Sequence, residues 1–413
     1  MNILIVGGGG REHALAWKIA ESKLASIVYS SVAAAEGGKI KFNFADMSTN
    51  ENVVAFCKTN AVDLVVVGPE APLAAGLADA LRAANIKVFG TVKAGAKLEY
   101  SKEYSKEFMQ KYNIPTAAYA SFTDLKPAQD YVQNAALPIV VKADGLAAGK
   151  GVRVCLTKEE AMQALTDFMA DSVLGASGHK VVVEEFLDGK EASIMAFVDG
   201  DSYKVLPVSR DHKRLLDGDK GPNTGGMGVY TPVADITAAD IEFVKTNVFD
   251  NVIKGLKAEG IDYCGIIYAG IMKGSQGTNV LEFNCRFGDP ETQTVLPVLK
   301  EDLLEIILAC CDKKLNSVAD FANTEASVCV ILAGGDYPAA PSKGIEITGL
   351  ENVKAQVFHS GTKKENGKFY TNGGRVLAVA ATAATMAEAR EKVYTEIQKI
   401  NFKGMQFRRD IGA

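Results

Sequence analysis

Three side chains at alternate positions of one apolar run could together bind a metal ion and a phosphoryl group. Glu282, Asn284 and Arg286 are spaced two residues apart in the segment LEFNCR. Because alternate residues of a strand face the same side, a strand here would place them on one face. A carboxylate and an amide oxygen suit Mg²⁺, and the guanidinium can bind a transferred phosphoryl group or a carboxylate. The same alternation is also typical of an ordinary half-exposed strand.

The turn after this run adds further polar side chains. Residues 288–293 read GDPETQ, with Asp289 before a proline and Glu291 two residues later. A plain surface strand seldom has so many ionic and amide groups within a dozen residues. We therefore expect the strand and its turn to belong to an active site.

A glycine-rich segment earlier in the chain has the features of a hairpin that covers phosphates. Residues 142–151 read KADGLAAGKG, and strand patterns lie on both sides. The spacing from Gly145 to Gly149 is one residue short of a Walker A loop, and Gly151 stands where Ser or Thr is required. We predict a flexible hairpin over a triphosphate, with the Lys142 ammonium meeting phosphate oxygens. The alternative is a solvated lysine beside an ordinary hairpin.

The segment VVVEEFL at 181–187 predicts a site for a nucleotide base. A strand that ends at Glu184 and Glu185 beside Phe and Leu would present backbone groups against an apolar wall, which suits adenine. Glu191 could accept hydrogen bonds from ribose hydroxyls. Acidic pairs at strand ends are usually solvated, so the interpretation depends on the neighbouring glycine hairpin.

Two polar loops lie between these segments. Residues 209–214 read SRDHKR, and residues 221–228 read GPNTGGMG. The glycine-rich loop could offer backbone N–H groups to a small anionic substrate, and His212 could carry a proton or simply orient a substrate. A solvated loop and a linker are the alternatives.

The surrounding pattern indicates the elements that must position these residues. In the first hundred residues short apolar runs alternate with helical patterns, which predicts a parallel sheet with crossover helices. The expected strands are 3–6, 27–30, 64–67 and 87–89, and the expected helices are 12–21, 52–58 and 74–84. The first strand runs into four glycines, 7–10, and then a helix, where an anion could bind unless the turn is only structural.

From about residue 100 the chain has a different pattern, rich in strands and glycine. The expected helices are 102–112, 159–171, 241–259 and 386–400, and the expected strands are 139–143, 152–156, 180–185, 265–272, 279–284, 327–333 and 375–382. The predicted fold class is α/β and α+β, with three domains at 1–100, 101–325 and 326–413.

Composition excludes several classes of protein. The chain has 413 residues and 47% hydrophobic residues, and it lacks an apolar run of the ~18 residues that would span a bilayer. With 45 basic and 50 acidic residues it has no global field for nucleic acid or a membrane, so any phosphate must be bound locally. Seven cysteines without a CxxC pair fit free thiols in a reducing compartment, and we predict a cytoplasmic protein.

Together these motifs resemble the phosphoribosylamine–glycine ligase family of ATP-grasp enzymes, and the resemblance covers nearly the whole chain. The segments that carry it are GREHALAW at 10–17, VGPEAPL at 67–73, KADGLAAGKGV at 142–152, EEFLDGKEAS at 184–193, DHKR at 211–214, GPNTGGMG at 221–228, EFNCRFGDPETQ at 282–293, FHSGTK at 358–363 and TNGGRVLAV at 371–379. RFGDPETQ separates this family from other ATP-grasp proteins.

The resemblance implies an N-terminal α/β domain, an ATP-grasp domain of two lobes, of which the one at about 115–190 is mobile, and a small C-terminal α+β domain. It also implies ligation of glycine to 5-phosphoribosylamine through glycyl phosphate, giving glycinamide ribonucleotide, ADP and phosphate in the second step of purine biosynthesis. ATP would be a substrate, and Mg²⁺ or Mn²⁺ would be required. The expected partners are these small molecules, without nucleic acid or membrane, and the protein would be a monomer or a weak homodimer.

The resemblance further implies roles for individual residues. Catalytic roles fall to Arg286, Asp289 and Asp211, and metal binding falls to Glu282 and Asn284. ATP would be bound by Lys102, Lys142, Gly149, Lys150, Gly151, Glu184, Glu185, Leu187 and Glu191. The other substrates would be bound by Gly9, Gly10, Arg11, Glu12, His13, Pro69, Glu70, His212, Lys213, Asn223 and Gly225.

The chain departs from the family pattern in two places. Gly8 stands where the family usually has Asn, and residues 30–38 replace a loop that contains Pro-Gly-Asn. Both departures touch the N-terminal substrate face, so the binding of phosphoribosylamine is the property most affected.

Three other functions compete with this interpretation. A nicotinamide oxidoreductase would need GxGxxG and an acidic residue after the second strand, and the sequence has neither. A non-catalytic nucleotide sensor would be expected to lack the metal pair, which is present. Another ATP-grasp carboxylate–amine ligase is the nearest rival.

Overall fold

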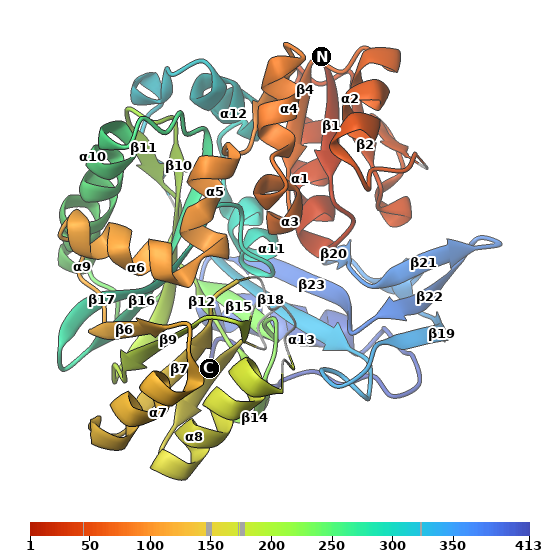
Figure 1. The fold of residues 1–413 in the computed structure, drawn as a ribbon. Helices are drawn as coiled ribbons and strands as arrows, with labels where there is room; N and C mark the ends of the chain where they lie inside the picture. Colours follow the sequence, from red (N-terminus) through yellow and green to blue (C-terminus); the bar gives the residue numbers. More distant parts are fainter. Residues whose placement is uncertain (44, 146–150, 172, 174–177, 323) are drawn as a thin grey trace.

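The N-terminal region is a parallel sheet with helices on both faces in the computed structural model, which describes residues 1–43, 45–145, 151–171, 173, 178–322 and 324–413 (Figure 1). Its strands, in the spatial order β3-β2-β1-β4-β5, are β1 (Asn2–Val6), β2 (Ile27–Ser30), β3 (Ile40–Phe42), β4 (Leu64–Val67) and β5 (Lys87–Phe89). Its helices are α1 (Gly10–Glu21), α2 (Asn50–Thr59), α3 (Glu70–Ala74), α4 (Leu77–Ala83) and α5 (Lys93–Tyr100).

Alternation along β1 supplies two hydrophobic cores. Ile3 and Ile5 pack in the core that includes α1, whereas Leu4 and Val6 pack in the core that includes α2 and α4. Successive strand residues point to opposite faces, so a strand that is apolar throughout must be covered on both sides. The predicted parallel sheet is confirmed.

The helix expected at 74–84 is the shorter helix α4, and a separate short helix, α3, precedes it and ends at Ala74. Gly76 separates them with a backbone φ of 82°, in the left-handed region that glycine adopts without strain. Strand β3 and helix α5 were not predicted.

The middle of the chain forms two antiparallel sheets, and Figure 1 shows the one with β6, β7 and β9 below the one with β10, β16 and β17. One contains β10 (Lys190–Val198), β11 (Tyr203–Val205), β16 (Gly265–Gly274) and β17 (Gly277–Asn284). The other contains β6 (Tyr119–Phe122), β7 (Ile139–Ala143), β8 (Val152–Cys155) and β9 (Val181–Glu185). The helices of this region are α6 (Lys102–Lys111), α7 (Leu125–Asn134), α8 (Lys158–Leu165), α9 (Ala238–Val244) and α10 (Asp250–Ala258).

Pairing of β7 with β8 is antiparallel, as the predicted glycine hairpin requires. Residues 146–150, which include the predicted Gly149 and Lys150, lie outside the described residues. The helices expected at 159–171 and 241–259 each contain a π-helical turn, at 166–170 and at 245–249.

A third sheet joins the C-terminal residues to two earlier strands. Its order is β12-β15-β18-β23-β20, with β12 (Arg210–Asp211), β15 (Gly228–Thr231), β18 (Ala326–Ala333), β20 (Gln356–His359) and β23 (Arg375–Ala383). Helix α13 (Met386–Ile397) packs on it. The other elements are β13 (Arg214–Leu216), β14 (Lys220–Asn223), β19 (Ser342–Ile347), β21 (Thr362–Glu365), β22 (Lys368–Gly373), α11 (Glu291–Val295) and α12 (Leu303–Cys311). The mixed α/β and α+β fold class is confirmed.

Two expectations from composition can be compared with the structure. Within the described residues, we find no helix both long and apolar enough to cross a membrane. All seven cysteines are free thiols, and Cys311 alone among them is more than slightly exposed.

Candidate active site

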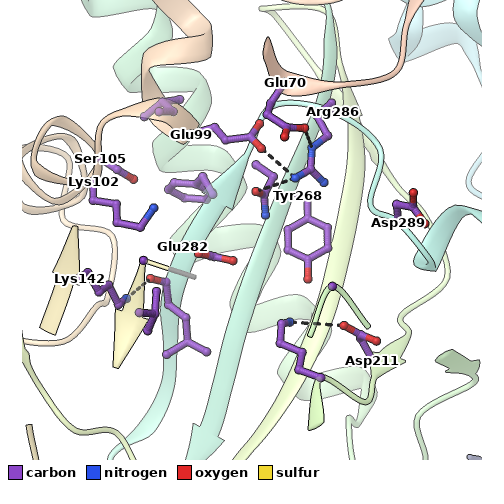
Figure 2. Close-up of a pocket in the computed structure, with 18 of the residues that line it drawn as sticks. Glu70, Glu99, Lys102, Ser105, Lys142, Asp211, Tyr268, Glu282, Arg286 and Asp289 are labelled. Atoms are coloured by element: carbon purple, nitrogen blue, oxygen red, sulfur yellow. Dashed lines mark hydrogen bonds and ion pairs between the residues drawn. The ribbon is translucent and has the colours of Figure 1, made fainter. Parts of the chain in front are cut away.

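The predicted functional segments converge on two adjoining cavities. The larger, of about 390 Å³, is here called the polar cavity; it receives side chains from the N-terminal sheet region, the two central sheets and the C-terminal sheet (Figure 2). The smaller, of about 230 Å³, is called the apolar cavity because Val140, Val154, Phe186, Leu187 and Met272 lie in its wall. The two are continuous, because they share Lys142, Val152, Glu184, Asp211, Lys213, Thr224, Tyr268, Leu281 and Glu282.

Strand β17 carries Glu282, Asn284 and, just after its end, Arg286 to the polar cavity, as the alternation predicted. The ladder with β16 is irregular at this point, because Gly270 pairs with Glu282 whereas the next residue, Ile271, pairs with Val280. Leu281 is therefore an extra residue of a β-bulge, and such bulges redirect the side chains of a strand. The sequence alone gave no signal for this irregularity.

The Glu282 carboxylate is held in its charged form. Burial would raise its pKa, but Lys102, Lys213 and Lys142 lower it further than burial raises it. Figure 2 shows Lys102 and Lys142 on one side of Glu282 and Tyr268 on the other. A charged carboxylate in a cavity attracts a cation.

The donors near Glu282 fit a metal that keeps ligands from outside the protein. The amide oxygen of Asn284 lies on the same face and at present accepts a hydrogen bond of 3.2 Å from Arg286. Within the described residues, no group of three or more His, Cys, Asp or Glu side chains could hold a metal alone. One carboxylate and one amide suit Mg²⁺, which usually completes its shell with water and substrate phosphates.

Two carboxylates fix the Arg286 guanidinium. Its Nη2 lies 2.9 Å from Oε1 of Glu99, and its Nε lies 3.5 Å from Oε2 of Glu70 (Figure 2). Oε2 of Glu99 also accepts a 2.7 Å hydrogen bond from the backbone N–H of Cys285. Burial raises the pKa of Glu99, although Arg286 opposes this, whereas Arg286 and other contacts overcome burial and lower the pKa of Glu70. Glu99 was not predicted, because α5 has no motif around it.

Asp289 is tied to the C-terminal sheet by Arg375. Nη2 of Arg375 lies 3.3 Å from Oδ2 of Asp289, and Nη1 donates to the backbone oxygens of Asp289 at 2.8 Å and of Gly225. Burial would raise the pKa of Asp289, but Arg375 and Arg11 lower it. Arg375 lies in a recognised motif, yet its function could not be foreseen without the fold.

Asp211 and Lys213 border both cavities. Nζ of Lys213 lies 3.7 Å from Oδ2 of Asp211 and 3.5 Å from Oε2 of Glu191. Burial raises the pKa of Asp211 to about 8, while Lys213 opposes the shift. The Tyr268 hydroxyl donates to Oε1 of Glu291 at 3.0 Å, and Tyr268 was not predicted to belong to the site.

Glu184 lies between two buried lysines. Its Oε2 is 3.0 Å from Nζ of Lys106, and its Oε1 is 2.9 Å from Nζ of Lys142. Lys142 also donates a 3.1 Å hydrogen bond to the backbone oxygen of Leu281. Lys106, on α6, was not predicted, because nothing in its local sequence distinguishes it from the solvated lysines of the same helix.

Most other predicted residues also reach the cavities. Those on the polar cavity are Arg11, Glu70, Lys102, Gly151 and Gly225, and those on the apolar cavity are Glu185, Leu187, Glu191 and Asn223. Arg11 donates to the backbone oxygen of Phe287 at 3.1 Å, so α1 is held against the turn that follows β17.

The remaining predicted residues take part in packing and capping near the cavities, and they are not among the described residues that line them. Glu12 accepts a 2.7 Å hydrogen bond from the N–H of Gly9 at the start of α1, and Nδ1 of His13 accepts one of 2.9 Å from the N–H of His359. Pro69 caps α3, Gly10 begins α1, and His212 packs against Tyr230 with 5.7 Å between ring centres. Burial lowers the pKa of His13 to about 4.

Comparison with known proteins gives one consistent result. Three family models match the chain in order: the N domain of phosphoribosylglycinamide synthetase at 1–99, its ATP-grasp domain at 100–292 and its C domain at 327–413. The chain is 46% identical to a phosphoribosylamine–glycine ligase of Neisseria meningitidis over 100% of its own length and 98% of that protein. It is also 46% identical to a trifunctional purine biosynthetic protein of Gallus gallus, over 99% of this chain and 42% of that one.

Solved structures agree with these sequence matches. A crystal structure of a phosphoribosylamine–glycine ligase from Thermotoga maritima superposes with a TM-score of 0.88 and 34% identity, over 99% of this chain and 100% of that one. A biotin carboxylase domain from Hydrogenobacter thermophilus superposes with a TM-score of 0.76 at 15% identity, over 98% of this chain and 91% of that one, which shows a shared fold.

Proposed function

The chain belongs to the phosphoribosylglycinamide synthetase family of ATP-dependent ligases in purine biosynthesis, and we propose how its two cavities divide the work of joining glycine to 5-phosphoribosylamine. The reaction consumes ATP and gives glycinamide ribonucleotide, ADP and phosphate. The observation that carries the division of the site is the continuity of an apolar cavity with a polar one across Lys142 and Glu282.

ATP lies across the junction of the two cavities in this proposal. Leu187 and Met272 provide the apolar wall for adenine, and Glu191 lies in the same wall, within reach of the ribose. Lys102 and Lys142 then face the phosphates, where their ammonium groups offset negative charge. Glu282 and Asn284 would hold a divalent metal, Mg²⁺ or Mn²⁺, which would neutralise phosphate charge when bound.

Glycine and phosphoribosylamine occupy the polar cavity, between β17 and the N-terminal sheet. Arg286 and Arg11 are cationic groups there, and Arg375 approaches from the C-terminal sheet. A carboxylate cannot acylate an amine directly, because an oxide ion is a very poor leaving group. The carboxylate of glycine attacks the γ-phosphorus of ATP, ADP leaves, and glycyl phosphate forms beside Arg286.

The amine of phosphoribosylamine then attacks the glycyl carbonyl carbon, and phosphate leaves. The attacking nitrogen must lose a proton, and Asp211 is the proposed acceptor because burial raises its pKa to about 8. Most of the rate enhancement would come from orientation and charge stabilisation, since no side chain forms a covalent bond.

Labelled glycine tests the intermediate. Glycine with ¹⁸O in its carboxylate should transfer one labelled oxygen to the released phosphate in each turnover, measured by mass spectrometry of the phosphate. Unlabelled phosphate, with both labels recovered in product and water, would contradict glycyl phosphate.

Phosphate release that depends jointly on glycine and freshly generated phosphoribosylamine tests the substrate pair. Another ATP-grasp carboxylate–amine ligase would instead release phosphate with a different acid or amine, so replacing each substrate in turn distinguishes the two. We also propose that the enzyme is cytoplasmic, where its seven free thiols would stay reduced, and that it is a monomer or weak homodimer.

A further inference from the structure

Lys106 is one of the most deeply buried charged side chains in the described structure. It lies on α6, whose first turn is capped by the Ser101 hydroxyl, and its side chain is 2% exposed. Its ammonium donates to Oγ1 of Thr116 at 2.8 Å and to the backbone oxygen of Ala117 at 3.3 Å. With Glu184 as third partner, the ammonium is fixed from several directions.

The two lysines and Glu184 form a row of alternating charge. Nζ of Lys106 is 3.0 Å from one carboxylate oxygen of Glu184, and Nζ of Lys142 is 2.9 Å from the other. The three side chains are 2%, 8% and 2% exposed for Lys106, Lys142 and Glu184. With all three groups charged, the row has a net charge of one positive unit beside the polar cavity.

An excess buried charge is costly unless an opposite charge is near. The excess positive charge of this row lies next to the wall where the ATP phosphates are proposed to bind, and both Lys106 and Lys142 line that wall. Without Lys106, Glu184 and Lys142 would form a neutral pair, and the Lys142 ammonium would be fully compensated by the protein.

We propose that Lys106 is a positioning residue for ATP: it compensates the charge of Glu184, so that the Lys142 ammonium stays available to the nucleotide phosphates. The proposal rests on the proposed position of ATP. It requires no contact between Lys106 and ATP, and it makes the charge of the row, rather than its packing, the property that matters.

Calorimetry of ATP binding, without glycine or phosphoribosylamine, measures the effect of Lys106 on ATP affinity directly. Lys106→Met should weaken ATP binding about tenfold, part of what a charge-assisted contact contributes. Lys111→Met is the matched control, since Lys111 is on the same helix with a 62% exposed side chain, and it should bind ATP as the parent does.

A compensating double variant separates charge from packing. In Lys106→Met with Glu184→Gln, Lys142 again has an unshared charge, so ATP affinity should return to within about threefold of the parent. Affinity as weak as in Lys106→Met alone, or an unchanged affinity in Lys106→Met, would overturn the proposal. Lys142→Met tests separately the assumption that the ATP phosphates lie beside Lys142. If this variant binds ATP as the parent does, the proposed position of ATP is wrong.

The pH dependence of ATP binding provides a second measurement. Burial lowers the pKa of Lys106 to about 8; Glu184 and Glu185 on β9 oppose the shift, and Lys142 on β7 adds to it. The ring of Tyr119 on β6 lies 5.8 Å from the ammonium. As pH rises past 8, Lys106 loses its proton, and the parent should bind ATP progressively more weakly. Lys106→Met should lack this decline, and an equal decline in both proteins would contradict the proposal.

Discussion

Glu99→Gln tests whether the orientation of Arg286 controls use of glycine. Glu99 receives two hydrogen-bond donors, the N–H of Cys285 at 2.7 Å and the Arg286 guanidinium at 2.9 Å. A glutamine has a single acceptor oxygen, so its amide N–H₂ must face one of these donors. The substitution therefore removes at least one buried charge-assisted hydrogen bond and weakens the hold on Arg286.

The expected size follows from this count. One hydrogen bond to a charged group contributes about 1.5–3 kcal/mol, which corresponds to roughly ten- to hundredfold in a rate or binding constant. We expect a loss of that order in kcat/KM for glycine, measured by phosphate release at saturating ATP and phosphoribosylamine. The Kd for ATP should change less than about twofold, because Glu99 contacts neither Lys102 nor Lys142.

Two further variants make the test specific. Glu107→Gln changes an exposed carboxylate on α6 and should keep the parent kinetics. Arg286→Lys cannot span Glu99 and Glu70 as the guanidinium does, so Glu99→Gln added to Arg286→Lys should cost little more. Parent-like kcat/KM for glycine together with a lowered melting temperature would show that Glu99 serves stability alone and would refute the reasoning.

Three other results are expected. Glu282→Gln or Asn284→Ala should raise the metal concentration needed for half-maximal turnover while the protein stays folded; an unchanged magnesium titration would contradict direct coordination. Gly8→Asn should alter KM for phosphoribosylamine but not for ATP, and it should fold, since an added Cβ would meet Ser31 at 3.9 Å; a changed KM for ATP would contradict the division of the site. Burial lowers the pKa of His13 from 6.5 to about 4, so the unfolded chain binds the proton more tightly than the folded chain does. The free energy of unfolding should therefore fall by roughly 3 kcal/mol as pH drops from 6.5 to 4. Chemical denaturation at several pH values measures this, and the loss should be smaller in His13→Gln.

The parts of the site that sequence could predict are those with a local period. The alternation of Glu282, Asn284 and Arg286 follows from strand geometry, and the glycine hairpin follows from the strands on both sides of it. Lys106 and Glu99 could not be found in this way, because each lies on a helix and meets its partner from a distant segment. Their burial depends on how the helices pack, which no local pattern encodes.

The bulge on β17 and the break at Gly76 show the same limit within the fold. Both strand and helix were predicted, but the exact register and the helix boundary depend on neighbouring strands and on one backbone angle. His13 illustrates the opposite case, since its motif was recognised yet its ring serves the junction with β20. Which residue of a motif touches a ligand is decided by packing.

The third sheet has a consequence for the time course of synthesis. Strands β12 and β15 emerge from the ribosome more than ninety residues before β18, which pairs with β15. Strand β15 ends at residue 231, and β18 begins at residue 326. During that interval β15 has an open edge, which in a nascent chain is a place where another strand can pair wrongly. Arg375 emerges later still, so Asp289 and the loop at Gly225 lack their contacts with Arg375 until residue 375 has been synthesised. The polar cavity of the nascent chain is therefore incomplete until Arg375 has joined the third sheet.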